Sequence, residues 1–311
     1  MGTADVVLPA SRVVPPWRAS LTVAARRLED VWAQIRRSRT AMVGLGILVF
    51  FALMATFAPL LAPYGPMERT PNCNALGQLC PPSNEHPLGT SFNNEDVVSQ
   101  VIWGSQVSLF VGVVSAAVAS VVGTAVGLIS GFAGGWIDEV MMRFNDIVLS
   151  VPWLVLMIVI AGIVGIIDLW GIIAVIGLTG WSLTARVIRA QVLSVKERMF
   201  VERARMVGSS NWHILWRHIF PNAFPLIFAN TILTVAISII SEAVLAFLRL
   251  SPPSVISWGR VINDAIQGGA LINNNAGWLI APGLCIVFLV FGFYLYGYAL
   301  DEILNPRLRR R

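Results

Sequence analysis

Long runs of apolar residues, uninterrupted by charge, dominate the pattern along this chain. No charged residue occurs within residues 40–67, 97–137, 147–167, 169–185, 218–241 or 265–300. A membrane-spanning helix needs about 20 predominantly apolar residues to cross roughly 30 Å of hydrocarbon. Runs of this kind predict membrane spans rather than the core of a soluble domain.

We predict about six spans, at residues 41–61, 104–133, 137–165, 168–188, 223–248 and 279–300. Because lipid cannot satisfy free backbone amides, all six should be α-helices. The charge-free stretch at 97–137 is too long for one span, so we expect residues 96–107 to form a helix along the outer face before the chain turns inward. Gly123, Gly127 and Gly131 favour tight helix packing, with a sliding or gating contact as the alternative.

Composition supports this all-α integral membrane class and sets an orientation. The chain is 56% hydrophobic and only 13% charged, whereas a soluble domain carries about a quarter charged residues. Most of the 22 basic residues lie before the first span, between the fourth and fifth spans, or after the last one. By the positive-inside rule, both termini are expected in the cytoplasm. Anionic lipid accounts for the net charge of +5, so no nucleic-acid partner is implied.

The predicted organisation is a cytoplasmic segment at residues 1–40, followed by one transmembrane domain at 41–311. Within that domain we expect an external loop at 62–103 and a cytoplasmic loop at 190–222. Cys73 and Cys80 fall in the external loop, where an oxidising compartment favours a disulfide; two free thiols are the alternative. Cys285 lies in the last span and is interpreted as a packing residue.

The cytoplasmic loop carries the most local information. It predicts two short helices, at residues 195–207 and 211–220, with a break at 208–210. Gly208 suits a helix C-cap, and Ser210 or Asn211 suits an N-cap. On the first helix, two faces are expected: an apolar one with Phe200, Ala204 and Val207, and a charged one with Arg198, Glu202 and Arg205. Such a helix either rests on the membrane or docks into a partner's groove, which the shallow surface at Glu202, Ala204 and Gly208 favours.

The sequence has no recognisable motif for catalysis or nucleotide hydrolysis. The only lysine, Lys196, follows no glycine-rich phosphate loop. The three histidines form no metal-binding spacing, and serines within the spans have no membrane histidine to activate them. We therefore expect no enzyme activity and no cofactor. Asp146 and Glu242 lie off the centre of the membrane, so they are interpreted as helix contacts or as groups that face a watery vestibule, rather than as a proton-coupling pair.

Residues 200–208 (FVERARMVG), followed by 218–222 (HIFPN), resemble the "EAA" loop of ABC importer permeases. Glu202, Ala204 and Gly208 match that motif, whereas Arg203 stands where a small residue is usual. The resemblance implies that this loop is a coupling helix, which fits a groove on an ATPase subunit through Glu202, Arg203, Ala204 and Gly208.

The resemblance extends over nearly the whole chain, to the C-type subunits of dipeptide and oligopeptide permeases, a branch that also includes nickel permeases. It rests on residues 58–64 (APLLAPY), 86–90 (HPLGT), 131–136 (GFAGGW), 242–248 (EAVLAFL), 257–259 (SWG) and 281–283 (APG). Residues 91–96 depart from the branch, which usually has Asp and then Gly-Arg-Asp there; only Asp96 is kept. Short peptides are the expected substrate, with nickel, opines, glycans or another small solute as alternatives.

A type I ABC importer permease fold in the bacterial plasma (inner) membrane is what the resemblance implies. The chain would form half of the translocation path beside a second, B-type permease. Two ATPase subunits would bind ATP and Mg, and an extracytoplasmic substrate-binding protein would deliver the substrate. Rival interpretations are a stand-alone proton-coupled secondary transporter and a membrane enzyme or assembly factor, but neither the midplane charges nor the reactive cluster that they need is evident.

Overall fold

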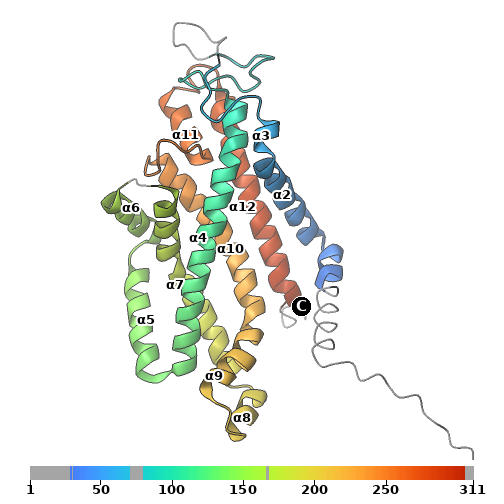
Figure 1. Cartoon of the computed structure of the whole chain (residues 1–311), viewed down its shortest axis with the longest axis vertical. Coiled ribbons are helices and arrows are strands. Elements are labelled where there is room, and N and C mark those ends of the chain that lie inside the picture. The colour runs from blue at the N-terminus through green and yellow to red at the C-terminus, as the bar shows by residue number, and fades with distance from the viewer. Residues whose placement is uncertain (1–28, 30, 71–79, 166–167, 305–311) are drawn as a thin grey trace, which may run out of the picture.

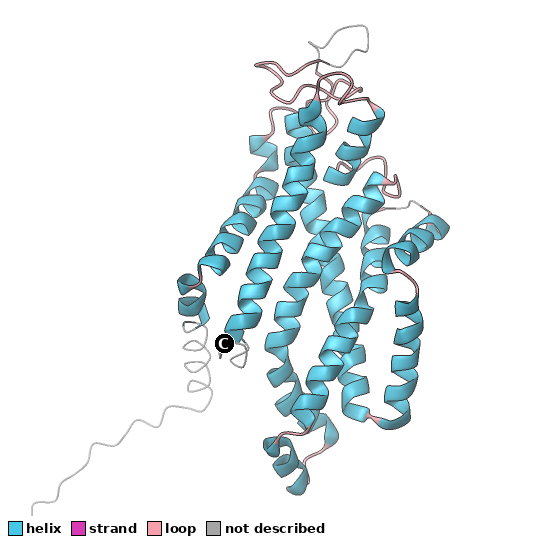
Figure 2. Cartoon of the chain, turned by 180° about the vertical axis from the view of Figure 1, so that it is seen from behind, coloured by secondary structure: helices cyan, strands magenta, loops and turns pink. Residues whose placement is uncertain are grey.

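The computed structural model describes residues 29, 31–70, 80–165 and 168–304 and forms an elongated bundle of helices (Figure 1). Over these ranges the chain has no strand (Figure 2), and its only β-type pairings are two isolated bridges, Arg69 with Glu95 and Thr90 with Asp96. Short helices and loops cover both ends of the bundle. We call them the α8 end, after α8 (Met199–Met206), and the α11 end, after α11 (Trp258–Gln267).

Five helices in the described ranges are long and apolar enough to cross a membrane. The first is α2 (Arg39–Thr56), which short α3 (Ala58–Leu61) extends. The others are α4 (Val97–Ala133), α7 (Leu169–Lys196), α10 (Phe220–Phe247) and α12 (Ala276–Leu304). Short α9 (Asn211–Ile214) and the π-helical turn η1 (Leu215–Ile219) run into α10. The apolar runs thus located these spans correctly.

The predicted third span was wrong as a single straight helix. It consists of α5 (Gly135–Ser150) and α6 (Trp153–Val164), which are bent by 86° relative to each other. Pro152 causes the break, because its ring disfavours the helical conformation for the preceding residue. Val151 accordingly has an extended backbone, with φ −85° and ψ 129°. The described part of the chain therefore has five candidate spans, or six if the bent pair counts as one.

The predicted surface helix at residues 96–107 was also wrong. α4 is one continuous helix of 37 residues, about 55 Å long at roughly 1.5 Å per residue. It exceeds the hydrocarbon thickness, and polar contacts hold its first turns at the α11 end. Asp96 caps the helix by accepting from the Ser99 amide at 2.8 Å, and its Oδ1 lies 3.0 Å from His86 Nδ1.

α4 and α7 pack most closely at the centre of the bundle. A Cβ added to Gly123 would lie 2.6 Å from Trp181 O, one at Gly127 2.7 Å from Ala185 O, and one at Gly131 2.9 Å from Val192 Cβ. These three glycines therefore let two helix backbones approach closely, which confirms the packing interpretation. The start of α2 and the end of α12 both point toward the α8 end (Figure 1). Which side of the membrane the α8 end faces stays a prediction.

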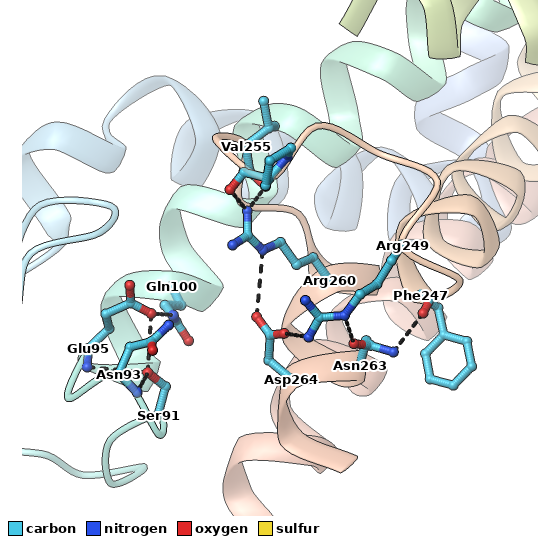
Figure 3. A network of polar contacts seen from close by, with 11 residues as sticks. Ser91, Asn93, Glu95, Gln100, Phe247, Arg249, Val255, Arg260, Asn263 and Asp264 are labelled. Atoms are coloured by element: carbon cyan, nitrogen blue, oxygen red, sulfur yellow. Dashed lines mark hydrogen bonds and ion pairs between the residues drawn. The ribbon is translucent and has the colours of Figure 1, made fainter. Parts of the chain in front are cut away.

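At the α11 end, a polar network fixes α11 (Trp258–Gln267) against the end of α10 (Figure 3). Arg249 donates to Asn263 Oδ1 and to Asp264 Oδ1, both at 2.7 Å, and Asn263 donates to Phe247 O at 2.8 Å. Arg260 adds an ion pair to Asp264 at 3.6 Å. Burial raises the pKa of Asp264 even though both arginines oppose that shift.

Candidate functional site

The charged loop predicted to carry function forms the tip of the α8 end (Figures 1 and 2). α8 (Met199–Met206) follows α7 after only two residues. The expected helix at 195–207 is thus divided, because α7 continues to Lys196 and Arg198 takes an extended conformation, with φ −79° and ψ 143°. The direct link makes α8 a continuation of a membrane span in a new direction.

Gly208 ends α8 as its sequence pattern predicted. Its φ is +83°, a conformation that glycine adopts without the penalty that a side chain incurs. The Gly208 amide donates to Arg205 O at 2.9 Å and the Ser209 amide to Ala204 O at 3.0 Å. Ser210 then caps α9 by accepting from the His213 amide at 3.3 Å. The predicted break at 208–210 is confirmed, but the second predicted helix does not end at residue 220, because α9 and η1 continue into α10.

One side of α8 is anchored in the bundle. Val201 is fully buried in a cluster with Val195 of α7, Ile214 of α9 and Ile219 of η1. Phe200 and Ala204 pack against the edge of the same cluster, as expected. The prediction was wrong for the third member of this apolar face, Val207, because that residue is 87% exposed. α8 ends at Met206, so the helical spacing used for that prediction no longer applies at Val207.

The other side of α8 and the start of α9 form an exposed area with both charge and large apolar groups. We define this α8 surface as Glu202, Arg203, Met206, Val207 and Trp212, all of which are exposed. Met206 is 79% exposed and Trp212 70%. The structure therefore places Glu202 and Arg203 on one accessible face, sets Ala204 half-buried beneath it, and uses Gly208 to form its edge. Neighbouring exposed apolar side chains mark a surface for contact with another protein or with the membrane.

Sequence reasoning missed Met206 and Trp212. Trp212 begins a series of aromatic residues spaced four apart along α9, η1 and α10, and neighbouring rings in the series lie 5.0–6.2 Å apart. The members are Trp212, Trp216, Phe220, Phe224 and Phe228. That regular spacing was readable in the sequence and would have marked an exposed helix face.

The two membrane acids make helix–helix contacts, which agrees with the simpler interpretation. Arg186 of α7 donates to Asp146 of α5 at 2.5 Å. Glu242 is buried in α10 and accepts from Ser108 of α4 at 2.9 Å. The expected bridge between Cys73 and Cys80 involves Cys73, which lies outside the described residues, so the bridge stays a prediction. Cys285 of α12 is a half-buried free thiol that packs beside apolar clusters.

Comparison with known proteins decides the family. Residues 123–310, which include α8 and all of its anchoring residues, match the family described as the inner membrane component of binding-protein-dependent transport systems. This chain belongs to that family. Residues 27–82 match a second description, the N-terminal transmembrane domain of oligopeptide transport permease C. The expected fold class and the multi-pass location in the inner membrane are thereby confirmed.

Similar proteins align over most of the chain. It is 35% identical to the oligopeptide transport system permease protein of Bacillus subtilis, over 91% of this chain and 90% of the relative. It is 31% identical to the dipeptide transport system permease protein of the same organism, over 91% of this chain and 86% of the relative. The dipeptide transport system permease protein of Alkalihalophilus pseudofirmus is 32% identical, over 95% of this chain and 91% of the relative. The chain is thus a membrane permease component of an ABC importer.

Proposed function

We propose that this permease component serves the uptake of short peptides and that its α8 surface docks onto an ATPase subunit. The α8 surface carries the proposal, because a short helix is anchored on one side and leaves charged and apolar groups exposed on the other. The peptide substrate is supported by relatives named as oligopeptide and dipeptide permeases, which align over most of this chain.

The geometry of α8 suits transmission of force. Val201 is buried, and the Gly208 turn closes the helix, so α8 can move only together with the helices it is packed against. A groove on a partner can receive such a short helix by its exposed face. Full burial of side chains such as Met206 and Val207 stabilises a complex by about 1.5–3 kcal/mol each. Glu202 and Arg203 would then set the orientation through pairing with groups of the partner.

In this proposal the α8 end is cytoplasmic. A second, B-type permease supplies the other half of the path, two ATPase subunits bind ATP and Mg, and an extracytoplasmic substrate-binding protein delivers peptide at the α11 end. Closure of the ATPases on ATP moves α8, and the spans reorient to open the path outward. This chain carries no ATP hydrolysis of its own.

Co-purification from the native membrane in mild detergent tests the docking. We expect the wild-type chain to bring two ATPase subunits and a second permease. Glu202→Arg combined with Gly208→Trp should lose the ATPases but keep the second permease, because only the α8 surface is altered. Glu139→Arg serves as the control, since Glu139 is an exposed acid on α5. A chain that purifies alone and transports without ATP would refute the proposal and favour a secondary transporter.

Substrate class is tested separately in proteoliposomes that contain the whole complex and its binding protein. Radiolabelled trialanine is the probe, and unlabelled tri- and tetrapeptides or nickel chloride are the competitors. We expect ATP-dependent uptake that peptides inhibit and nickel does not. Uptake of ⁶³Ni²⁺ without uptake of trialanine would contradict the peptide assignment while leaving the ATPase docking intact.

A further inference from the structure

The turn between α4 and α5 lies beside the last turns of α7. α4 ends at Ala133 and α5 begins at Gly135, so the chain reverses within a very short turn (Figure 1). Gly134 and Gly135 both have positive φ, +67° and +55°. Glycine adopts positive φ without the steric penalty that a side chain incurs, so it permits this reversal. The turn places the end of α4 next to the start of α5.

Lys196, the last residue of α7, holds the α4 side of this turn. Its Nζ donates to Phe132 O at 2.7 Å and lies 5.8 Å from the centre of the Phe132 ring. Phe132 O is among the last four carbonyl groups of α4, which lack an amide partner within the helix. A cation at this position also interacts favourably with the negative end of the helix dipole.

Arg189 of α7 holds the α5 side. Its Nε and Nη2 donate to the two carboxylate oxygens of Asp138, both at 2.6 Å. Asp138 lies in the first turn of α5, where the helix dipole favours an anion. Two parallel charge-assisted hydrogen bonds fix both distance and orientation. Arg189 and Lys196 are seven residues apart, which places them on the same face of α7 two turns from each other.

Apolar packing fixes α5 mainly through the Phe144 ring, which stacks on Trp181 of α7 at 6.2 Å. Asn145 is the only buried residue of α5. On the α4 side, Gly127 and Gly131 bring α4 close to α7, and Val192 of α7 lies against Gly131. The polar contacts of Lys196 and Arg189 therefore hold the α4–α5 turn on α7, and the ion pair of Arg186 with Asp146 holds α5 further along.

We propose that Lys196 and Arg189 form a clamp that transmits the displacement of α8, through α7, to α4 and α5 together. Both are positioning residues of the transport cycle, and the proposal rests on the ATPase docking proposed above. Only two residues separate Lys196 from α8, and Val195 and Val201 share one buried cluster on either side of that link. A shift of α8 therefore reaches the clamp without an intervening flexible segment.

α4 can carry this shift to the other end of the bundle. Ser108 of α4 accepts from the Trp258 amide at 3.3 Å and donates to Glu242 at 2.9 Å, which ties α4 to α11 and α10. Trp258 Nε1 also donates to Val101 O of α4 at 2.8 Å. A movement that begins at α8 thus has a continuous path to the α11 end.

Two distances in the assembled complex test the clamp. Spin labels are placed on α7 (Ser194→Cys) or α5 (Val140→Cys), each paired with a label on α12 (Tyr298→Cys), because all three side chains are exposed. Cys285 is replaced by serine, and protein without added cysteine measures background labelling. Distances are recorded without nucleotide and after trapping with ATP and vanadate, and co-purified ATPase is quantified in every sample.

In the wild-type complex both label pairs should shift on trapping. Lys196→Met with Arg189→Met should keep the ATPases and the α7 shift but lose the α5 shift, when made in an Arg186→Met background that removes the ion pair to Asp146 and by itself keeps both shifts. Lys196→Arg should retain the α5 shift, and exchange of charges by Arg189→Asp with Asp138→Arg should restore part of it. Arg143→Met is the matched control, since Arg143 is an exposed cation of α5 whose ion pair, at 3.9 Å to Glu139, is long.

An α5 shift of wild-type size in the double methionine variant overturns the clamp. An α7 reporter that stays still in a complex holding both ATPases also overturns the clamp but leaves the docking standing. Absence of the ATPases from the wild-type complex overturns the docking itself, and the clamp with it. If only the methionine variant fails to assemble, the charge-exchange variant (Arg189→Asp with Asp138→Arg) decides instead. An α5 shift that this variant does not restore counts against the clamp.

Discussion

The two ends of the bundle each carry a short helix, α8 or α11, and the two helices are held in opposite ways. At the α8 end, apolar Val201 provides the anchor, while Glu202 and Arg203 face outward. At the α11 end, charged groups pair within the chain, as Arg249 does with Asp264 at 2.7 Å. Charged side chains that form no ion pair within the described part of the chain can pair with groups of a partner. The comparison thus supports the proposal that another subunit docks on α8, whereas the contacts of α11 lie within this chain.

The largest effect should come from placing a charge under α8. Val201→Asp buries an unpaired carboxylate in the cluster that holds α8, which should cost about 4 kcal/mol or more. Val207→Asp puts the same charge on an exposed position and should change stability by only about 0.5 kcal/mol, yet weaken ATPase binding. Thermal unfolding in detergent and co-purification measure the two effects. Equal loss of stability in both variants would contradict the anchored-and-exposed description of α8.

A backbone change at the edge of the α8 surface should come next. Gly208→Ala forces a side chain into positive φ, which costs about 1–2 kcal/mol. No heavy atom lies within 4 Å of the added Cβ, so the penalty is conformational and Gly208→Asn should be milder. ATPase activity of the complex and its dependence on trialanine are the measurements. Full coupling in Gly208→Ala would show that the turn has no role in positioning α8.

At the α11 end, Arg249→Met removes two hydrogen bonds that join α10 to α11. Hydrogen bonds to charged groups contribute about 1.5–3 kcal/mol, and because the Arg249 side chain is half exposed, screening lowers the expected cost to about 1 kcal/mol. Hydrogen exchange should increase across α11, whereas the amount of co-purified ATPase should not change. A loss of ATPase in this variant would break the proposed division of roles between the two ends.

The smallest effect should be a dependence of stability on pH at Asp264. Burial raises its pKa in the folded protein, so between that value and the lower pKa of the unfolded chain the folded state binds more protons. Its contribution to the free energy of unfolding is then greatest at low pH and falls as pH rises through the folded-state pKa. Asp264→Asn should remove this dependence. Unfolding measured across mildly acidic pH in both proteins tests the sign, and a contribution that grows with pH would contradict it.

Local patterns predicted the spans and the break at Gly208 well. Apolar runs respond to the solvent, since any helix that crosses lipid must be apolar along a membrane thickness. The conformation required at Gly208 is equally local, because a single residue takes positive φ there. The bend at Pro152 had a visible cause, but proline also occurs within α10 and α12 without breaking either helix. A proline in the sequence therefore does not by itself predict a broken span.

Other features needed the fold because they join residues far apart in sequence. Lys196 and Phe132 are 64 residues apart, and Arg189 and Asp138 are 51 apart. Helical spacing alone placed Val207 on the buried face, and only the packing of α8 under α7 and η1 assigned that role to Val201. The sequence therefore settled which segments enter the membrane, since lipid acts on each residue independently. The fold settled which charges hold helices together and which face a partner, since those depend on neighbours that only tertiary packing brings close.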